Sequence, residues 1–323
     1  MTLCGLKVSK AVPEYDYRKY LDPKVLAKIS GLELRARLIV EGFFSGIHHS
    51  PQHGLSVEFA DHRAYTQGDD LRHIDWKVFG KTDKYFIKEY EQETNLNLML
   101  VVDCSESMSF TSGDEGMTKH EYATAVAAAV AYLTLQQQDS VGLTLFDERL
   151  THFLRPANNP HHWKVLVQEL AGKTGPAKTS IGRVLTELAE RLNHRLLIIL
   201  ISDLFDDPQA ILKGLKHLRY RRHEVIVWNI WDAAELNLPF AGPVRFEGLE
   251  STGRLLVDPR RVRKRYVEEV ERFQSQLRAG CGHLFIDYTV FSTGMALDAA
   301  LSGYLATRAA RLRQHSSRVL GGG

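Results

Sequence analysis

The sequence predicts an α/β protein built on a doubly wound, mostly parallel sheet of the Rossmann type, with helices on both faces. Three observations favour this fold. From residue 95 onward, short apolar segments alternate with segments of helical periodicity. The apolar segments are nearly continuous, which is typical of strands buried on both faces. Two of the helices begin with an aspartate followed by a proline, which is a helix-start signal.

The region before residue 95 has a different character. Residues 13–45 indicate two helices with a break at Gly31. Residues 46–92 are rich in Gly, His, Asp and aromatic residues, which indicates irregular loops and short strands. We therefore predict three parts: a helical and irregular amino-terminal module over residues 1–94, the α/β domain over 95–305, and a flexible tail over 306–323.

Within the α/β domain, each expected element has a local signal. Thr118 and Glu121 form a capping-box pair at the start of an alanine-rich helix. The predicted helices begin at Thr118, Asp207 and Asp258, the last of these reaching about Leu277, and a final helix spans Met295–Leu305. The predicted strands are Leu96–Val102, Ser140–Phe146, Leu150–Leu154, Leu196–Ile201, Val225–Ile230 and Leu284–Val290.

Composition excludes several classes of protein. The formal net charge is +2, so no overall field attracts nucleic acid or an anionic membrane. No apolar run approaches the ~20 residues of a membrane-spanning helix, and the amino terminus lacks the features of a signal peptide. The cysteines Cys4, Cys104 and Cys281 are widely spaced and give neither a disulfide framework nor a zinc motif. We therefore expect a cytoplasmic protein that has no membrane span and does not bind nucleic acid.

Polar residues follow two of the most apolar predicted strands. Asp103 comes directly after the first strand, with Ser105 and Ser107 behind it, and Asp203 follows the strand near residue 200. Ligands of open parallel sheets bind at the carboxyl ends of the strands, so these side chains should meet there. Thr179, which precedes a helix, could supply a further hydroxyl. These oxygen donors predict a hard divalent cation, Mg²⁺ first, with Mn²⁺ or Ca²⁺ as alternatives.

These residues resemble the metal-ion-dependent adhesion site of von Willebrand factor A domains. That site has an Asp-x-Ser-x-Ser run after the first strand, a Thr before a later helix and an Asp after the fourth strand. The resemblance implies that Ser105 and Ser107 bind the ion directly, that Thr179 does so in one state, and that Asp103 and Asp203 act mainly through water. It also implies a von Willebrand factor A-like, protein-binding module, whose ion takes a carboxylate from a protein partner.

A second motif lies upstream of the first strand. Its residues are Phe59, Arg63, Tyr65, Gly68, Asp69, Arg72, Ile74, Asp75 and Trp76. The run resembles the signature of a bacterial family of von Willebrand factor A-like proteins, domain-of-unknown-function (DUF) family fifty-eight, over about residues 30–308. Gly80–Lys81 departs from the family's more usual alanine and arginine, and the transmembrane helices of many members have no counterpart. Members are often encoded beside MoxR-type AAA+ ATPases, so the resemblance implies such an ATPase as a partner in complex assembly.

Other interpretations of the same residues stay open. Asp and Ser after a strand are common turn residues, and Thr179 could simply cap its helix. Arg63 and Arg72 could form ion pairs that fix the upstream segment on the sheet, an interpretation we favour over a partner surface. We predict a binding protein rather than an enzyme. The alternatives are a metal-dependent hydrolase with Glu106 as general base, and a structural subunit with a vestigial metal site.

Overall fold

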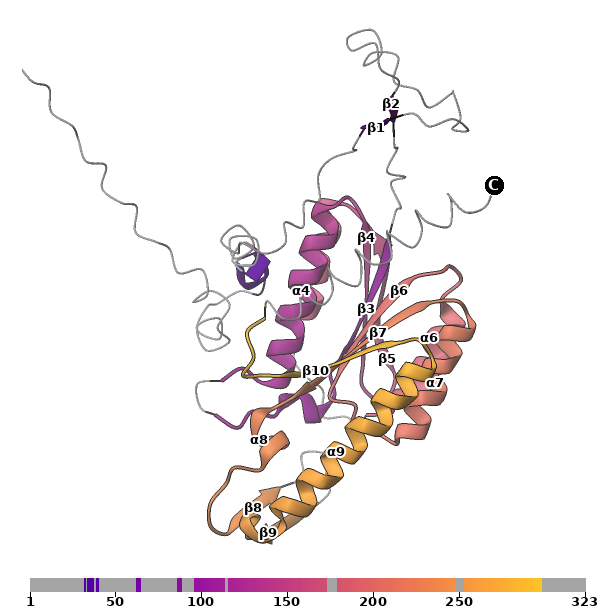
Figure 1. Ribbon diagram of the computed structural model, residues 1–323. Helices are drawn as coiled ribbons and strands as arrows, with labels where there is room; N and C mark the ends of the chain where they lie inside the picture. The colour runs from indigo at the N-terminus through magenta and orange to yellow at the C-terminus, as the bar shows by residue number, and fades with distance from the viewer. Residues whose placement is uncertain are drawn as a thin grey trace, which may run out of the picture.

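A computed structural model of the chain describes residues 32, 34–37, 39–40, 62–64, 86–88, 96–113, 116–172, 179–247 and 253–297. Within them, a six-stranded sheet has the order β10-β7-β6-β3-β4-β5 (Figure 1). All neighbouring strands are parallel except β5, which runs antiparallel at one edge. The strands are β3 (Asn97–Asp103), β4 (Ser140–Phe146), β5 (Leu150–Ala157), β6 (Leu197–Ser202), β7 (Glu224–Trp231) and β10 (Asp287–Ser292). The predicted doubly wound, mostly parallel α/β fold is confirmed.

The two central strands are buried on both faces because their side chains alternate between two separate cores. In β3, Leu98, Leu100 and Val102 pack on one side of the sheet. Met99 and Val101 pack on the other side. The isoleucines and leucines of β6 divide between the two cores in the same way. Burial on both faces explains why these segments are continuous apolar runs rather than alternating patterns.

Helices cover both faces of the sheet and give the domain three layers (Figure 1). α4 (Lys119–Gln136) and α5 (Pro160–Leu170) pack on the face toward which Leu100 points. α6 (Ile181–Arg191), α7 (Pro208–Tyr220) and α9 (Pro259–His283) pack on the opposite face. None of the helices in the described part of the chain combines the length and the apolar character needed to cross a bilayer.

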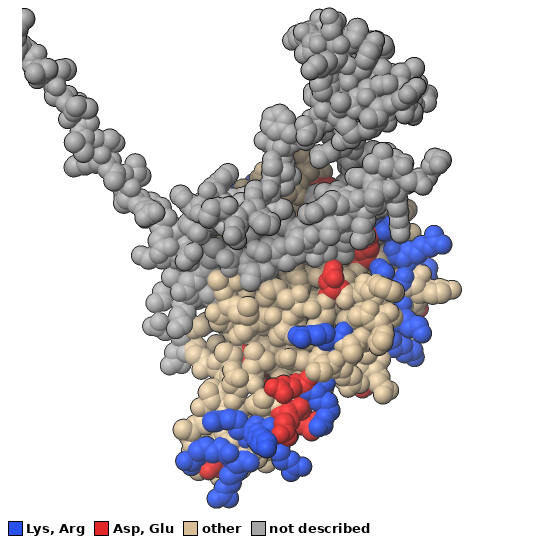
Figure 2. Space-filling model, viewed as in Figure 1, with Lys and Arg blue, Asp and Glu red and all other residues tan. Residues whose placement is uncertain are grey.

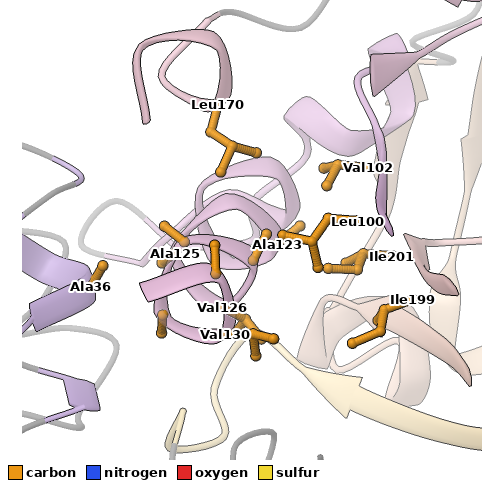
Figure 3. Packing of buried hydrophobic residues seen from close by; sticks show 14 of the residues in the cluster. Ala36, Leu100, Val102, Ala123, Ala125, Val126, Val130, Leu170, Ile199 and Ile201 are labelled. Atoms are coloured by element: carbon orange, nitrogen blue, oxygen red, sulfur yellow. The ribbon is translucent and has the colours of Figure 1, made fainter. Parts of the chain in front are cut away.

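The alanine-rich helix α4 is buried around most of its circumference. One side contacts the sheet, and Ala36, Ile39 and Val40 from the amino-terminal region belong to the same core. Figure 3 shows Leu100 and Val102 on one side of α4 and Ala36 on the other. Small side chains allow this close approach from two sides. The described residues between 32 and 40 are helical, as predicted, and residues 13–31 lie outside the described part.

Three of the predicted helix starts, at Thr118, Asp207 and Asp258, are confirmed. Thr118 and Glu121 form the full capping box of α4, in which each side chain accepts a hydrogen bond from the other residue's backbone N–H. The side chain of Asp207 accepts hydrogen bonds from backbone amides of the first turn of α7, and Asp258 does the same for α9. Each of these two helices has proline at its first position.

The boundary between α9 and β10 was predicted wrongly. The helix continues to His283, six residues past the expected end, and the strand begins at Asp287 rather than at Leu284. Phe285 turns the chain with a φ of 54°, in the left-handed region. The apolar residues that looked like the start of a strand are therefore the turn after α9, in which Ile286 is buried in the core.

Several elements had no predicted counterpart. The short helix α8 (Ala233–Asn237) follows β7, and a hairpin of β8 (Val244–Glu247) and β9 (Arg254–Val257) precedes α9. Exposed basic residues gather at this end of the molecule (Figure 2). They are Arg245, Arg260, Arg261, Lys264 and Arg265. The overall charge of +2 therefore conceals a local basic surface at the start of α9.

Two predicted regions lie largely outside the described residues. Of residues 46–92, β1 (His62–Ala64) and β2 (Phe86–Lys88) are described, and they form an antiparallel pair, in line with the expected short strands. The ion pairs expected of Arg63 and Arg72 fall outside the described side chains. The predicted final helix, Met295–Leu305, is described only as far as residue 297, where the chain forms turns.

The edge strand β5 is irregular. Its pairing with β4 shifts register twice, between Val141 and Leu143 and between Leu145 and Phe146. Pro156 lies within the strand and has no backbone N–H. Irregular pairing of this kind twists and bends an edge strand, so the sheet ends here on a distorted strand rather than a flat one.

Candidate metal centre

The strand-end aspartates lie where the doubly wound topology reverses. From β3 the chain passes to β4 on one side, and it later returns to β6 on the other side of β3. Asp103 is the last residue of β3, and Asp203 directly follows the last residue of β6. Both carboxylates are fully buried. Because these strands are neighbours in parallel register, their carboxyl ends place the two aspartates at one crevice.

The loop after β3 folds two serines back toward Asp103. The backbone N–H of Ser105 donates to Asp103 Oδ1 at 2.9 Å. The hydroxyls of Ser105 and Ser107 lie 3.1 Å apart, and both serines are buried. Ser107 belongs to a short 3-10 helix, η3 (Glu106–Ser109), which tightens the loop. The alternating serines therefore present two hydroxyl oxygens to one point, as expected from their spacing.

Asp103 is held in an environment that disfavours its charge. Burial, followed by the nearby charge of Asp203, raises the pKa of Asp103 to about 7. The hydroxyl of Ser202 donates to Asp103 Oδ2 at 2.6 Å, and this bond, like those from Ser105, acts in the opposite direction. Two buried carboxylates that raise each other's energy are an arrangement that a cation would stabilise.

Thr179 is half-buried and precedes α6 by two residues. The amides of Ile181 and Gly182, in the first turn of α6, donate to Asp206 Oδ2 at 2.8 and 3.4 Å. Asp206 belongs to the loop that begins with Asp203. A carboxylate from this loop therefore caps α6 and ties the segment that contains Thr179 to the loop. The residue at the N-cap position is Ser180, not Thr179.

The packing of α6 on α7 is close at this point. A Cβ added to Gly182 would come within 2.7 Å of the backbone oxygen of Ala210 in α7. Gly214, in α7, faces Leu185 of α6 at a similarly short distance. The two glycines let the helix backbones approach each other, so the position of the first turn of α6 depends on them.

Lys119 is the main feature that sequence patterns did not indicate. It is the first residue of α4, and its side chain is fully buried. Its Nζ donates to Asp203 Oδ2 at 2.8 Å and to Glu235 Oε1 at 2.7 Å. Burial alone would lower the pKa of Lys119, but the charges of Asp203 and Glu235 raise it above its ordinary value. The site therefore contains a permanent positive charge.

The ion pairs extend into a network at the same end of the sheet. Glu235 Oε2 accepts a hydrogen bond from the N–H of Asp232 at 2.9 Å, in the capping box of α8. Asp232 Oδ2 in turn accepts from Ser112 N and from Thr293 Oγ1, each at 3.2 Å. The loops that follow β3, β7 and β10 are thereby joined around the two aspartates.

The donor chemistry fits a hard divalent cation. Two serine hydroxyls and two carboxylates, all oxygen donors, are buried at the carboxyl ends of β3 and β6. Within the described ranges, no group of three or more His, Cys, Asp or Glu side chains is placed to hold a metal ion. A centre at this position would therefore depend on the hydroxyls of Ser105 and Ser107. Metal binding by these residues stays a prediction.

A nucleophilic cysteine does not fit the site. Cys104 lies between Asp103 and Ser105 in the sequence, and its Sγ is 3.6 Å from His120 Nε2. Burial, followed by the charges of Asp103 and Asp147, raises the pKa of the Cys104 thiol to about 12. Since the thiolate is the reactive form, the Cys104–His120 pair is unsuited to nucleophilic catalysis.

Comparison with known proteins gives a family and distant relatives. The family model described as "Protein of unknown function DUF58" matches residues 61–276. The uncharacterized protein Rv1480 of Mycobacterium tuberculosis (strain ATCC 25618 / H37Rv) is 27% identical over 233 residues, covering 71% of this chain and 72% of its own length. The uncharacterized protein Mb1516 of Mycobacterium bovis has the same identity and coverage.

Solved structures with a related shape are more distant. The conserved hypothetical protein BatB from Bacteroides thetaiotaomicron is 15% identical, with a TM-score of 0.42, over 66% of this chain and 98% of its own. The VWA domain of SpRpn10 is 10% identical, with a TM-score of 0.39, over 64% and 93% of the two chains.

Proposed function

Because the chain belongs to the DUF58 family, whose function is unknown, we propose a function from the site itself: a protein-binding module that depends on a divalent cation. One observation carries the proposal. Asp103, Ser105, Ser107 and Asp203 gather, buried, at the crevice where the topology of the sheet reverses. Open α/β sheets bind their ligands at this position. We propose binding rather than catalysis, in the cytoplasm.

Each residue of the site would have its own role in holding the ion. Ser105 and Ser107 would hold a magnesium ion through their hydroxyls, with Asp103 and Asp203 acting mainly through water and Thr179 joining in one state. The ion would supply an open coordination position for a carboxylate of the partner. The Asp103 carboxylate orients the serine loop through the N–H of Ser105, which keeps both hydroxyls facing one point.

An aromatic side chain beside the centre offers the partner an apolar contact. Phe205 lies two residues after Asp203, and its side chain is 37% exposed. Two contacts hold its ring in place. The centroid of the ring lies 5.0 Å from that of Trp231, in an edge-on arrangement, and 4.6 Å from the Nζ of Lys119. We propose that the partner places a carboxylate at the ion and an apolar group on Phe205.

A test of the ion site is thermal unfolding in Mg²⁺ and in EDTA. Saturating Mg²⁺ is expected to raise the melting temperature of the wild type by roughly 5 °C or more, because the ion binds only the folded state. Ser105→Ala should abolish the rise. Ser109→Ala is the matched control: its hydroxyl donates to Glu106 O within η3, outside the donor set, so the rise should persist. A wild type without any rise would favour a structural subunit.

A test of binding uses a purified MoxR-type AAA+ ATPase as the proposed partner. Complex formation, measured by biolayer interferometry, should require Mg²⁺ and should be lost in Ser105→Ala. Phe205→Ala should weaken the complex while leaving the Mg²⁺-induced rise in melting temperature intact, because Phe205 touches the partner and not the ion. Equal binding in EDTA and Mg²⁺ would remove the ion from the mechanism. Phosphoester turnover that depends on Glu106 would instead favour a hydrolase.

A further inference from the structure

We infer that Lys119 is a built-in cation of this centre, which competes with the divalent ion for Asp203 and thereby limits how tightly the ion binds. The inference rests on the proposed metal-dependent function and concerns the regulation of the same site. It assigns a role to a residue that lies outside the oxygen donor set and 84 positions from Asp203 in the chain.

The position of Lys119 is energetically unfavourable for a charged side chain, for two reasons. The side chain has no solvent exposure, although lysine is among the residues least often buried. It also occupies the first position of α4, where the partial positive charge of the helix end repels a cation. Its two carboxylate partners and the nearby rings of Phe205 and Phe110 offset these terms, and both carboxylates belong to the carboxyl-terminal edge of the sheet.

The contacts of Asp203 show why the two cations compete. Asp203 Oδ2 accepts from the ammonium of Lys119 at 2.8 Å, and Oδ1 accepts from the N–H of Phe205 at 3.3 Å. Both oxygens are therefore engaged before any ion arrives. An ion that draws on the charge of Asp203, directly or through water, must share that carboxylate with an ammonium, and two cations beside one carboxylate repel each other.

Glu235 gives the ammonium a second partner. Lys119 Nζ donates to Glu235 Oε1 at 2.7 Å, and the other oxygen of Glu235 is held by the N–H of Asp232. When an ion draws on Asp203, Lys119 can keep its pair with Glu235 without leaving the buried site. Glu235 thus weakens the interaction between Lys119 and Asp203. Loss of the Glu235 carboxylate should make Lys119 compete more strongly with the ion for Asp203.

The test is the affinity of the full-length chain for Mn²⁺, measured by electron paramagnetic resonance of the free ion and by calorimetry. Lys119→Met replaces the ammonium by an uncharged, unbranched side chain of similar size, and should tighten Mn²⁺ binding by about tenfold or more. Glu235→Gln should weaken binding several-fold. Equal affinity in the wild type and in Lys119→Met would overturn the inference while leaving the metal-dependent function standing.

A double variant guards against loss of folding and against a mere effect of net charge. Lys119→Met/Glu235→Gln removes one charge of each sign, so the net charge of the cluster is unchanged, and Asp203 is the one buried carboxylate that loses its ammonium partner. Tighter Mn²⁺ binding than in the wild type supports competition at Asp203. Affinity equal to that of the wild type contradicts it.

The remaining outcomes are also decisive. If neither the wild type nor Lys119→Met binds Mn²⁺, the metal-dependent function fails and the inference fails with it. If only Lys119→Met binds Mn²⁺, Lys119 takes the place of the ion in the wild type, which supports the inference and removes the ion from the natural mechanism. Adding Ser105→Ala to Lys119→Met should abolish binding, which locates the ion at this centre.

Discussion

In EDTA at pH 8, Asp103→Asn is expected to be more stable than the wild type by a few kcal/mol. The substitution removes one of two buried carboxylates that repel each other, and it keeps the shape of the side chain. Asparagine can still accept the hydrogen bond from Ser105 N with its oxygen and face Ser202 with its amide. Addition of Mg²⁺ should reverse the order, because the ion stabilises the wild type and finds an incomplete site in the variant.

The difference in stability should depend on pH in one direction. The pKa of Asp103 is about 7 in the folded protein and near 3.8 in the unfolded chain. Between these values only the folded state holds the proton, so the wild type loses stability as the pH rises from about 4 to about 7. The advantage of Asp103→Asn should be close to zero near pH 4 and complete at pH 8, as measured by urea unfolding.

Asp207→Asn is the matched control for this experiment. It makes the same change of charge at the same end of the sheet, but its side chain is exposed and caps α7, a role that asparagine fills equally well. Its stability should track that of the wild type at every pH. An Asp103→Asn variant that is less stable than the wild type in EDTA at pH 8 would show that the protein already neutralises this pair of carboxylates.

Gly182→Ala is expected to destabilise the protein by about 1–3 kcal/mol, although alanine is ordinarily the better residue in a helix. Its Cβ would meet the backbone of Ala210 at 2.7 Å, and backbone cannot rotate away as a side chain can. α6 must therefore shift away from α7. Because the amide of Gly182 also contacts Asp206, the variant should in addition reduce the Mg²⁺-induced rise in melting temperature.

Gly282→Ala provides the control for this second prediction. Gly282 lies in α9, and an added Cβ would meet nothing within 4 Å. The substitution should be neutral or stabilising by up to about 1 kcal/mol, through helix propensity alone. Urea unfolding of both variants decides the matter. If they have the same stability, the close approach of α6 and α7 at Gly182 is not a constraint on the fold.

Much of the fold could be predicted because its signals are local. Buried parallel strands are continuous apolar runs, and a capping residue followed by proline marks the start of a helix in the sequence itself. The end of α9 could not be predicted, since Leu284 and Ile286 have the composition of a strand and only the left-handed turn at Phe285 separates them from it. The β8–β9 hairpin has four-residue strands, too short to give a clear periodic pattern.

The candidate site was predictable in part, for a similar reason. Asp103, Ser105 and Ser107 share one loop, and the rule that ligands bind at strand ends brings in Asp203. Lys119 and Glu235 are separated by 116 residues and meet only because the start of α4 and the start of α8 face the same crevice. Nothing in the neighbouring sequence of either residue reports that meeting. The role of Asp206 could not be predicted for the same reason, because Asp206 precedes α7 in the sequence but caps α6.

The irregular edge at β5 has a consequence for how the protein behaves at high concentration. A flat edge strand offers its free amides and carbonyls to any other extended chain, which is the usual route to aggregation and to recognition by strand addition. Pro156 removes one such donor, the two register shifts break the row of the others, and Arg155 is exposed beside them. This edge should therefore resist polymerisation and should not accept a partner's strand.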